Sequence, residues 1–349
     1  MLKLEFKPYI LQKKYVFRIA GGARTSTPLV LTKLSYDGVE GFGEASMPPL
    51  YGESIETTIQ FISKIDLSAF TNPYETESIL EYVDQIAPGN QAAKAAFDIA
   101  LHDLICKLLG IPLHHYFGLP AKNLVTSKTI GIDTPEVMAQ RVQEASDFQY
   151  LKIKLGTDND RELVEAIKLV SDQPLYVDAN QGWKDKEIAL DFIHWLKEQG
   201  VVFIEQPLPK ANKADLAWLT ARSPLPIIGD EGIQRLTDLK DAASLYHGIN
   251  IKLMKSTGLR EAFKMANTAK ALGLKIMLGC MSETSCAIAA AAHLGALADW
   301  IDLDGNLMIT NDPYHGHQVQ NGKIMLNRFT GIGLLNPQWN QIPDYVEKI

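Results

Sequence analysis

Short apolar runs rich in β-branched residues recur at a near-constant interval after Pro120. Each run ends in a characteristic residue pair, and successive pairs lie 22 to 27 residues apart. The pairs are Thr129-Ile130, Ile153-Lys154, Val177-Asp178, Ile204-Glu205, Gly229-Asp230, Ile251-Lys252, Met277-Leu278 and Ile301-Asp302. A strand, a helix and two short loops need about this length, and eight such strands close a barrel. The interval therefore predicts a (β/α)7β TIM-like barrel over residues 121–326.

A doubly wound open sheet is the alternative arrangement of alternating strands and helices. It usually has fewer strands, and its dinucleotide-binding form carries a GxGxxG turn. This sequence has no such turn. The barrel is therefore the favoured fold.

Residues 1–120 have a different texture and predict a mixed α+β unit. The patterns indicate strands at Leu2–Phe6, Leu29–Tyr36 and Val39–Ala45, a hairpin turn at Asp37-Gly38, and a helix at Gln91–Leu109 that stops at Gly110. The segment 327–349, which contains Gly331-Ile-Gly333 and two prolines, is expected to pack back on this unit.

Composition excludes several classes of partner. The 349 residues are 46% apolar and 21% charged, with a net charge of −7, so a broad basic face for nucleic acid is not expected. The three cysteines show no CxxC spacing, which argues against a disulfide framework or zinc knuckle. Neither a signal peptide nor an apolar stretch of about 18 residues is found, so we expect a cytoplasmic protein without a membrane span.

Acidic residues follow three successive predicted strands. They are Asp178 in YVDAN, Glu205 in FIEQP and Asp230 in IIGDE, spaced by 27 and 25 residues. Functional groups of such barrels lie at the C-terminal ends of the strands, where three converging carboxylates would repel one another without a cation. Each acid alone could equally cap a helix, but the shared register favours a metal site. Oxygen ligands suit Mg²⁺, or Mn²⁺ as a substitute.

Lysines occupy alternate positions on one strand and the end of another. Lys152 and Lys154 in LKIKL share one side of strand two, and Lys252 in NIKL lies at the end of strand six, across the barrel. Lysines facing the lumen near a metal can act as bases, and a pair on opposite sides suits removal and return of an α-proton. For Lys255 we expect a side chain that reaches solvent.

Taken in order, KIK, DAN, EQP, GDE, NIKLMKSTG and GCMSET resemble the enolase superfamily, muconate-lactonizing subgroup. The resemblance spans essentially the whole chain and implies that residues 1–120 form a capping domain. It implies Mg²⁺ ligation by Asp178, Glu205 and Asp230, and an acid/base pair at Lys154 and Lys252. Lys152 matches the residue that binds the substrate carboxylate.

A second set of residues narrows the substrate. Asp302 and Asp304 in IDLDG point to the same side, and a paired-carboxylate cleft is a natural receptor for an ammonium group. The pair resembles the DxD motif of dipeptide epimerases, which holds the substrate's N-terminal ammonium. Arg24, expected in a glycine-rich loop over the barrel mouth, is similar in position to the arginine that binds a glutamate side chain. Helix capping and surface decoration are the alternative roles.

The resemblance implies a Mg²⁺-dependent dipeptide epimerase for L-Ala-D/L-Glu, serving cell-wall peptide recycling. Within the superfamily, the alternatives are an o-succinylbenzoate synthase, a cycloisomerase or an N-acylamino acid racemase, whose substrates carry no free ammonium. A catalytically silent binding barrel would have no need of these buried charges. Two departures are Glu231-Gly232, where the subgroup often has Glu-Ser, and Thr129, where some relatives carry serine. A homo-oligomer is expected, because soluble enzymes commonly form closed symmetric assemblies.

Overall fold

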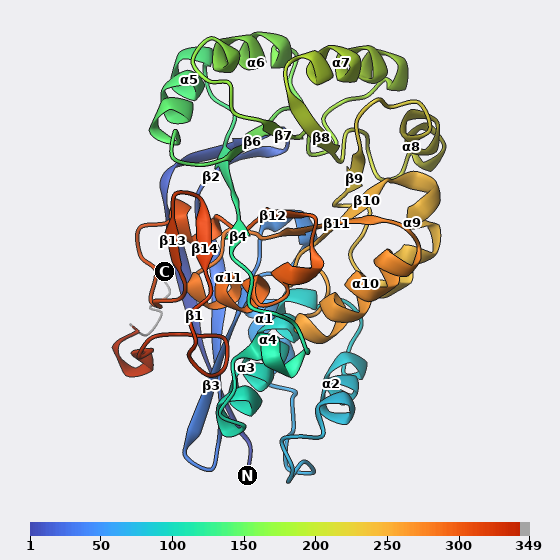
Figure 1. The fold of residues 1–349 in the computed structure, drawn as a ribbon. Coiled ribbons are helices and arrows are strands. Elements are labelled where there is room, and N and C mark those ends of the chain that lie inside the picture. Colours follow the sequence, from blue (N-terminus) through green and yellow to red (C-terminus); the bar gives the residue numbers. More distant parts are fainter. Residues whose placement is uncertain (343–349) are drawn as a thin grey trace.

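Eight parallel strands form one sheet in the order β12-β11-β10-β9-β8-β7-β6-β5 in the computed structural model, which describes residues 1–342 (Figure 1). The strands are β5 (Ser127–Ile130), β6 (Tyr150–Lys154), β7 (Leu175–Asp178), β8 (Val201–Glu205), β9 (Ile227–Gly229), β10 (Gly248–Ile251), β11 (Lys275–Gly279) and β12 (Trp300–Asp302). The sheet curls until Thr126, just before β5, bridges Ile301 of β12. The predicted barrel is confirmed, with each strand at its expected residue pair.

A helix separates each strand from the next, which completes the (β/α)7β pattern. These helices are α5 (Pro135–Glu144), α6 (Asp160–Lys168), α7 (Lys186–Glu198), α8 (Lys213–Thr220), α9 (Leu239–Leu245), α10 (Leu259–Ala271) and α11 (Ser285–Ala292). Figure 1 shows α5 to α10 as an arc outside the strands. Several begin at side-chain caps, as where Thr134 accepts a hydrogen bond from the Val137 amide and Asp185 from the Ile188 amide.

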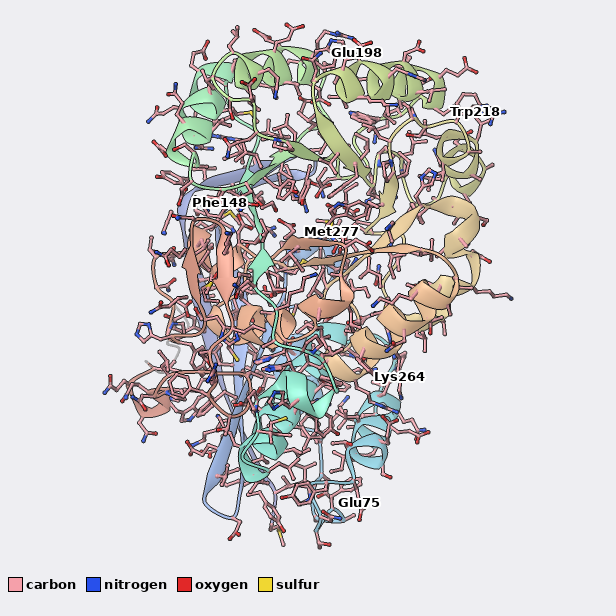
Figure 2. The ribbon with its side chains drawn as sticks, in the orientation of Figure 1. Glu75, Phe148, Glu198, Trp218, Lys264 and Met277 are labelled. Carbon is pink, nitrogen blue, oxygen red and sulfur yellow. The ribbon has the colours of Figure 1, made fainter. Side chains whose placement is uncertain are left out.

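Side chains along each barrel strand alternate between the lumen and the surrounding helices. The side chains that face the lumen form an apolar layer at one end of the barrel and a charged layer at the other. Tyr176, Phe203, Ile228 and Met277 form a buried cluster inside the barrel (Met277 is labelled in Figure 2). Two positions further along their strands stand Asp178, Glu205 and Asp230. The apolar layer therefore closes one end of the lumen, and the same strand register brings the acids to the other end.

The N-terminal unit is an antiparallel sheet covered by helices. Its strands are β1 (Lys3–Ile19), β2 (Gly22–Tyr36) and β3 (Val39–Ser46), and its helices are α1 (Ile55–Ile62), α2 (Thr76–Gln85), α3 (Gln91–Leu108) and α4 (Leu113–Tyr116). The backbone of α3 packs directly on β3, because a Cβ on Gly43 would lie 2.1 Å from the Ala96 carbonyl oxygen. Glycine at this position therefore permits the close approach of helix and strand.

The strands β1 and β2 are much longer than their apolar patterns predicted. Their far ends form a hairpin in which Phe17 pairs with Arg24, and the Ile132 amide donates to the Arg18 carbonyl oxygen beside the barrel. Arg24 therefore lies on a strand, and its predicted position in a loop was wrong. The glycine-rich segment read as a loop contributes only the tight turn before Gly22.

The chain after β12 returns towards the N-terminal unit. A small sheet joins β13 (Gln318–Gln320) and β14 (Lys323–Met325) to β4 (Leu124–Val125). Further on, Gly331 bridges Pro112, and the Ile332 amide donates to Asp103 on α3 at 2.8 Å. Residues 343–349 of the predicted C-terminal segment lie outside the described residues. Among residues 1–342, none of the helices has the length and apolar character needed to cross a bilayer.

Candidate active site

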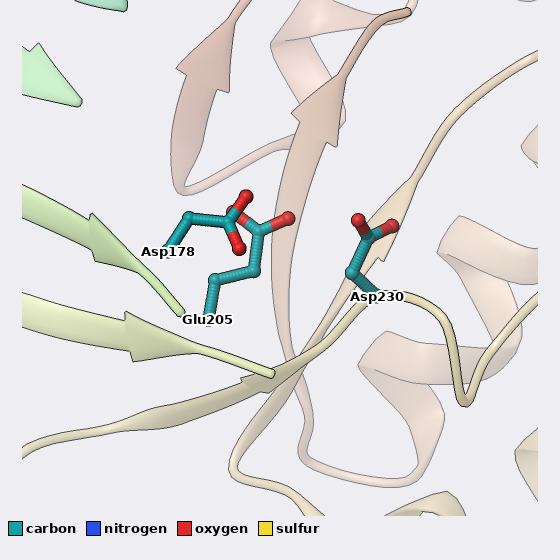
Figure 3. A group of neighbouring side chains, drawn as sticks. All are labelled: Asp178, Glu205 and Asp230. Carbon is teal, nitrogen blue, oxygen red and sulfur yellow. The ribbon is translucent and has the colours of Figure 1, made fainter. Parts of the chain in front are cut away.

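Three buried carboxylates meet at the C-terminal ends of adjacent strands (Figure 3). Asp178 ends β7, Glu205 ends β8 and Asp230 follows β9, and one oxygen from each lies within 4.8 Å of the others. Asp178 and Glu205 are paired in register across the two strands. Backbone pairing therefore fixes the separation of these two groups, and Figure 3 shows Asp230 facing them from the next strand.

Neighbouring amides orient the carboxylates. The backbone amide of Asn180 donates to Asp178 Oδ1 at 2.9 Å, and Asn250 Nδ2 donates to Glu205 Oε1 at 2.7 Å. Burial and the charge of Asp178 raise the pKa of Glu205 to about 7. Removing water and clustering like charges both penalise the ionised form, and a divalent cation would reverse that penalty. The oxygen-only donor set and its spacing fit Mg²⁺.

Lysines surround the acidic cluster from two sides. Lys152 Nζ lies 2.7 Å from Glu205 Oε2 and 2.7 Å from Asp302 Oδ2, and Lys154 Nζ lies 2.5 Å from Asp178 Oδ2. Burial lowers the pKa of Lys152, but the adjacent carboxylates outweigh it and hold this pKa well above its usual range. These contacts favour the charged form of Lys152 between the acidic cluster and Asp302.

Lys252 stands opposite, immediately after β10, which is four strands from β6 in the barrel order. Its Nζ donates to Asp230 Oδ2 at 2.7 Å. Lys154 and Lys252 thus approach the carboxylate cluster from opposite walls of the barrel, the former at Asp178 and the latter at Asp230. A substrate atom held above the cluster would have one amine on each side.

The expectation that Lys255 reaches solvent was wrong. Its side chain is buried, and Nζ donates to Asp230 Oδ1 at 2.5 Å, to the Asp230 carbonyl oxygen at 2.7 Å and to the Asn250 carbonyl oxygen at 3.0 Å. The chain turns helically after Lys252, since the Ser256 amide donates to the Lys252 carbonyl oxygen. This turn carries Lys255 back beneath the strand ends, where its ammonium contacts Asp230 instead of solvent.

Asp302 and Asp304 form a second buried acidic group beside Lys152. Asp302 Oδ1 accepts from Ser127 Oγ at 2.8 Å, and Asp304 Oδ2 accepts from the Thr129 amide at 2.7 Å. Burial raises the pKa of Asp304, and the charge of Asp302 adds to this effect. The pair therefore joins β12 to β5 at the point of barrel closure, and both carboxylates retain lone pairs for a further donor.

One cavity between the hairpin and the barrel mouth brings most of the predicted residues together. Its lining includes Arg24, Lys152, Lys154, Asp230, Lys252, Asp302 and Asp304. Asp178 and Glu205 lie against it, through their contacts with Lys152. Arg24 is partly buried, and its guanidinium lies 5.9 Å from the centre of the Phe17 ring. All nine predicted residues thus belong to one continuous site.

Several site residues escaped the sequence patterns. Asn250 stands two positions before Lys252 on the same strand face, so alternation could have revealed it. Tyr51 and Lys13 come from the N-terminal unit, where no strand-end pattern marks them. Glu231 is buried beside Asp230, and burial with that charge raises its pKa to about 8. Its side chain accepts from Asn180 Nδ2 at 3.3 Å.

Comparison with known proteins agrees with this geometry. Residues 8–118 match the family model described as mandelate racemase / muconate lactonizing enzyme, N-terminal domain, and residues 136–334 match the model described as enolase C-terminal domain-like. The L-Ala-D/L-Glu epimerase of Bacteroides thetaiotaomicron is 52% identical over 336 residues, which cover 96% of this chain and 88% of that protein.

Two solved structures with ligands have the same fold. A substrate-liganded complex of the L-Ala-D/L-Glu epimerase from Bacillus subtilis superposes with a TM-score of 0.91 at 29% identity, covering 95% of this chain and 98% of that one. A dipeptide epimerase from Enterococcus faecalis, complexed with Mg and the dipeptide L-Leu-L-Tyr, gives a TM-score of 0.90 at 31% identity, covering 95% and 98%.

Proposed function

The chain belongs to the mandelate racemase and muconate lactonizing enzyme family of the enolase superfamily, and from this premise we propose that it is a Mg²⁺-dependent L-Ala-D/L-Glu epimerase. It is an isomerase of the epimerase type, like its close relatives. The observation that carries the proposal is the placement of Lys154 and Lys252 against opposite sides of one carboxylate cluster.

Proton transfer is assigned to these two lysines. A dipeptide whose α-carbon lies between them can lose its proton to one amine and regain it from the other on the opposite face, which inverts the configuration. A magnesium ion held by Asp178, Glu205 and Asp230 would stabilise the negative charge that develops on the substrate carboxylate. Lys152, whose charged form is favoured beside this cluster, would bind the same carboxylate.

The acidic pair accounts for the choice of a dipeptide. Asp302 and Asp304 are buried at the edge of the cavity, and an N-terminal ammonium would compensate charge that Lys152, beside Asp302, and Lys128, 3.8 Å from Asp304, only partly offset. The substrates of o-succinylbenzoate synthases, cycloisomerases and N-acylamino acid racemases carry no free ammonium. They would place an apolar or anionic group against the negative charge of Asp302 and Asp304. Arg24, which faces the same cavity, would bind the carboxylate of a glutamyl side chain.

Proton NMR in D₂O gives the direct test. With Mg²⁺ and L-Ala-L-Glu, we expect the glutamyl α-proton signal to disappear while L-Ala-D-Glu accumulates. Treatment with EDTA should stop the exchange, and Mg²⁺ should restore it, with Mn²⁺ as the substitute. Absence of exchange at micromolar enzyme in the presence of Mg²⁺ would refute the assignment.

The biological setting and assembly are parts of the same proposal. Interconversion of L-Ala-L-Glu and L-Ala-D-Glu fits recycling of cell-wall peptides, which contain D-amino acids. We also propose that the chain forms a homo-oligomer, because closed symmetric assemblies are common among soluble enzymes. Light scattering coupled to size-exclusion chromatography would give a monomer mass of 38.7 kDa if this is wrong.

A further inference from the structure

Lys13 is held over the barrel mouth by an irregular stretch of the long hairpin. The pairing of β1 with β2 shifts register between Gln12 and Phe17, and Lys13 lies inside the shifted segment. Its backbone bridges Ile309, which follows β12, and the Thr310 amide donates to the Gln12 carbonyl oxygen at 3.0 Å. The irregularity therefore anchors Lys13 to the barrel instead of leaving it on the free edge of the hairpin.

No carboxylate in the described part of the chain forms an ion pair with Lys13. Nζ donates to the hydroxyl group of Ser282 and lies 4.8 Å from the centre of the Phe17 ring. Within residues 1–342, no carboxylate lies at ion-pair distance from it, although the side chain is partly buried. Burial, with a further effect of Arg24, lowers the pKa of Lys13 to about 8, against a weaker attraction from Asp304 that raises it. A partly buried cation satisfied only by a hydroxyl and a ring is costly unless an anion joins it.

Arg24 also lies beside the Phe17 ring without a carboxylate partner among residues 1–342. Its guanidinium lies 5.9 Å from the Phe17 ring centre, and it makes no ion pair with any carboxylate in the described part of the chain. Like Lys13 it is partly buried, and burial lowers its pKa also. Two desolvated cations of the hairpin therefore share one aromatic side chain at the mouth of the barrel.

The cavity beside Lys13 shares wall residues with the active-site cavity that Arg24 lines. Lys13 lines a cavity of about 210 Å³ whose walls include Phe17, Thr129 and Met308, and these three residues also line the active-site cavity. Lys13 and Arg24 thus line adjoining cavities with the Phe17 ring near both, and an anionic group extending from the substrate towards the hairpin would approach both cations. Within residues 1–342, Asp304 attracts Lys13 only at longer range, and no carboxylate lies at ion-pair distance from either cation.

We propose that Lys13 is a specificity-determining residue, which together with Arg24 binds the side-chain carboxylate of an acidic dipeptide. The inference rests on the proposed epimerase activity and adds a second cation to its substrate selection. A carboxylate has two oxygens, so an ammonium and a guanidinium can each engage one of them. Selection for glutamate over its neutral isostere glutamine would then depend on both cations.

The test compares two substrates of nearly equal shape, L-Ala-L-Glu and L-Ala-L-Gln, on wild type and on Lys13→Met. We expect the variant to lose roughly 10- to 100-fold in kcat/KM for L-Ala-L-Glu through KM, because a charge-assisted hydrogen bond is removed. For L-Ala-L-Gln the value should stay within about threefold, since no charge is lost there. Lys13→Arg should recover most of the difference.

Lys64→Met is the control, because it removes the same charge from an exposed residue that lines neither cavity. It should leave the ratio of the two substrates unchanged. If Lys13→Met loses kcat/KM equally for both substrates, Lys13 has a structural role and the proposal is overturned. If kcat/KM is unchanged for both substrates, the proposal is overturned as well. Failure of wild type to exchange the α-proton of any dipeptide would instead refute the epimerase function itself.

Discussion

A buried histidine cluster connects three parts of the chain and should make the protein sensitive to acid. His114 lies on α4 of the N-terminal unit, His293 follows α11 of the barrel, and His317 lies in the segment that returns after β12. The rings of His293 and His317 are 5.1 Å apart, and those of His114 and His293 are 5.2 Å apart. Charging any of them would place a cation that no carboxylate of residues 1–342 compensates by an ion pair.

His317 allows the effect to be calculated. Burial, with a smaller effect of His114, lowers its pKa to about 4 from an ordinary value of 6.5, and its Nε2 has no hydrogen-bond partner. His317 therefore becomes protonated below about pH 6.5 in the unfolded chain, but only below about pH 4 in the folded chain. Stability contributed by the neutral ring is present above pH 6.5 and is lost as the pH falls. The loss is about 2 kcal/mol at pH 5 and approaches about 3 kcal/mol near pH 4.

Urea unfolding of wild type and His317→Gln, followed by circular dichroism, measures this effect. Glutamine does not titrate, so the packing difference between the two proteins is constant and only the pH-dependent part changes. Between pH 7.5 and pH 5, wild type should lose about 2 kcal/mol more of its unfolding free energy than the variant does. Parallel pH profiles of the two proteins would refute the assigned protonation state of His317.

Three further predictions concern the site and its support. Lys154→Ala and Lys252→Ala should each reduce the rate of epimerisation by about 10²- to 10⁴-fold. Each variant should still exchange the α-proton of one epimer with D₂O. Proton NMR of the two epimers, measured separately, would detect this exchange. Asp302→Asn should raise KM for L-Ala-L-Glu by about 10-fold or more with a smaller change in kcat, and an unchanged KM would remove its assigned contact with the ammonium. Gly258→Ala should lower the unfolding free energy by more than about 2 kcal/mol in a denaturant titration. Gly258 has φ +109°, and a Cβ there would lie 2.4 Å from the Asp98 side chain. A smaller loss would mean that the start of the following helix can shift.

Regular alternation explains which parts of the site could be predicted. Lys152, Lys154 and Asp178 stand on strands whose side chains face the lumen at every second position, so sequence alone placed them on one wall. Lys255 and Lys13 break this rule because each lies where the backbone leaves regular pairing, the former in a helical turn and the latter in a register shift. Such irregularities are set by tertiary contacts, which a local pattern does not contain.

The residues proposed for proton transfer lie at the ends of regular barrel strands, whereas those proposed for substrate specificity lie on the hairpin. Lys154 and Asp178 are direct partners in the pairing of β6 with β7, so moving either one disturbs the barrel. Lys13 and Arg24 lie instead on a hairpin that is joined to the barrel by a few bonds, among them the Ile132 amide to the Arg18 carbonyl oxygen. We therefore expect substitution on the hairpin to change which side chain is accepted, while Lys154 and Lys252, the proposed proton-transfer groups, keep their places. Neutral replacements at Lys13 and Arg24 together should redirect preference towards uncharged dipeptides without abolishing α-proton exchange, and loss of exchange with every dipeptide would show that hairpin and barrel do not act independently.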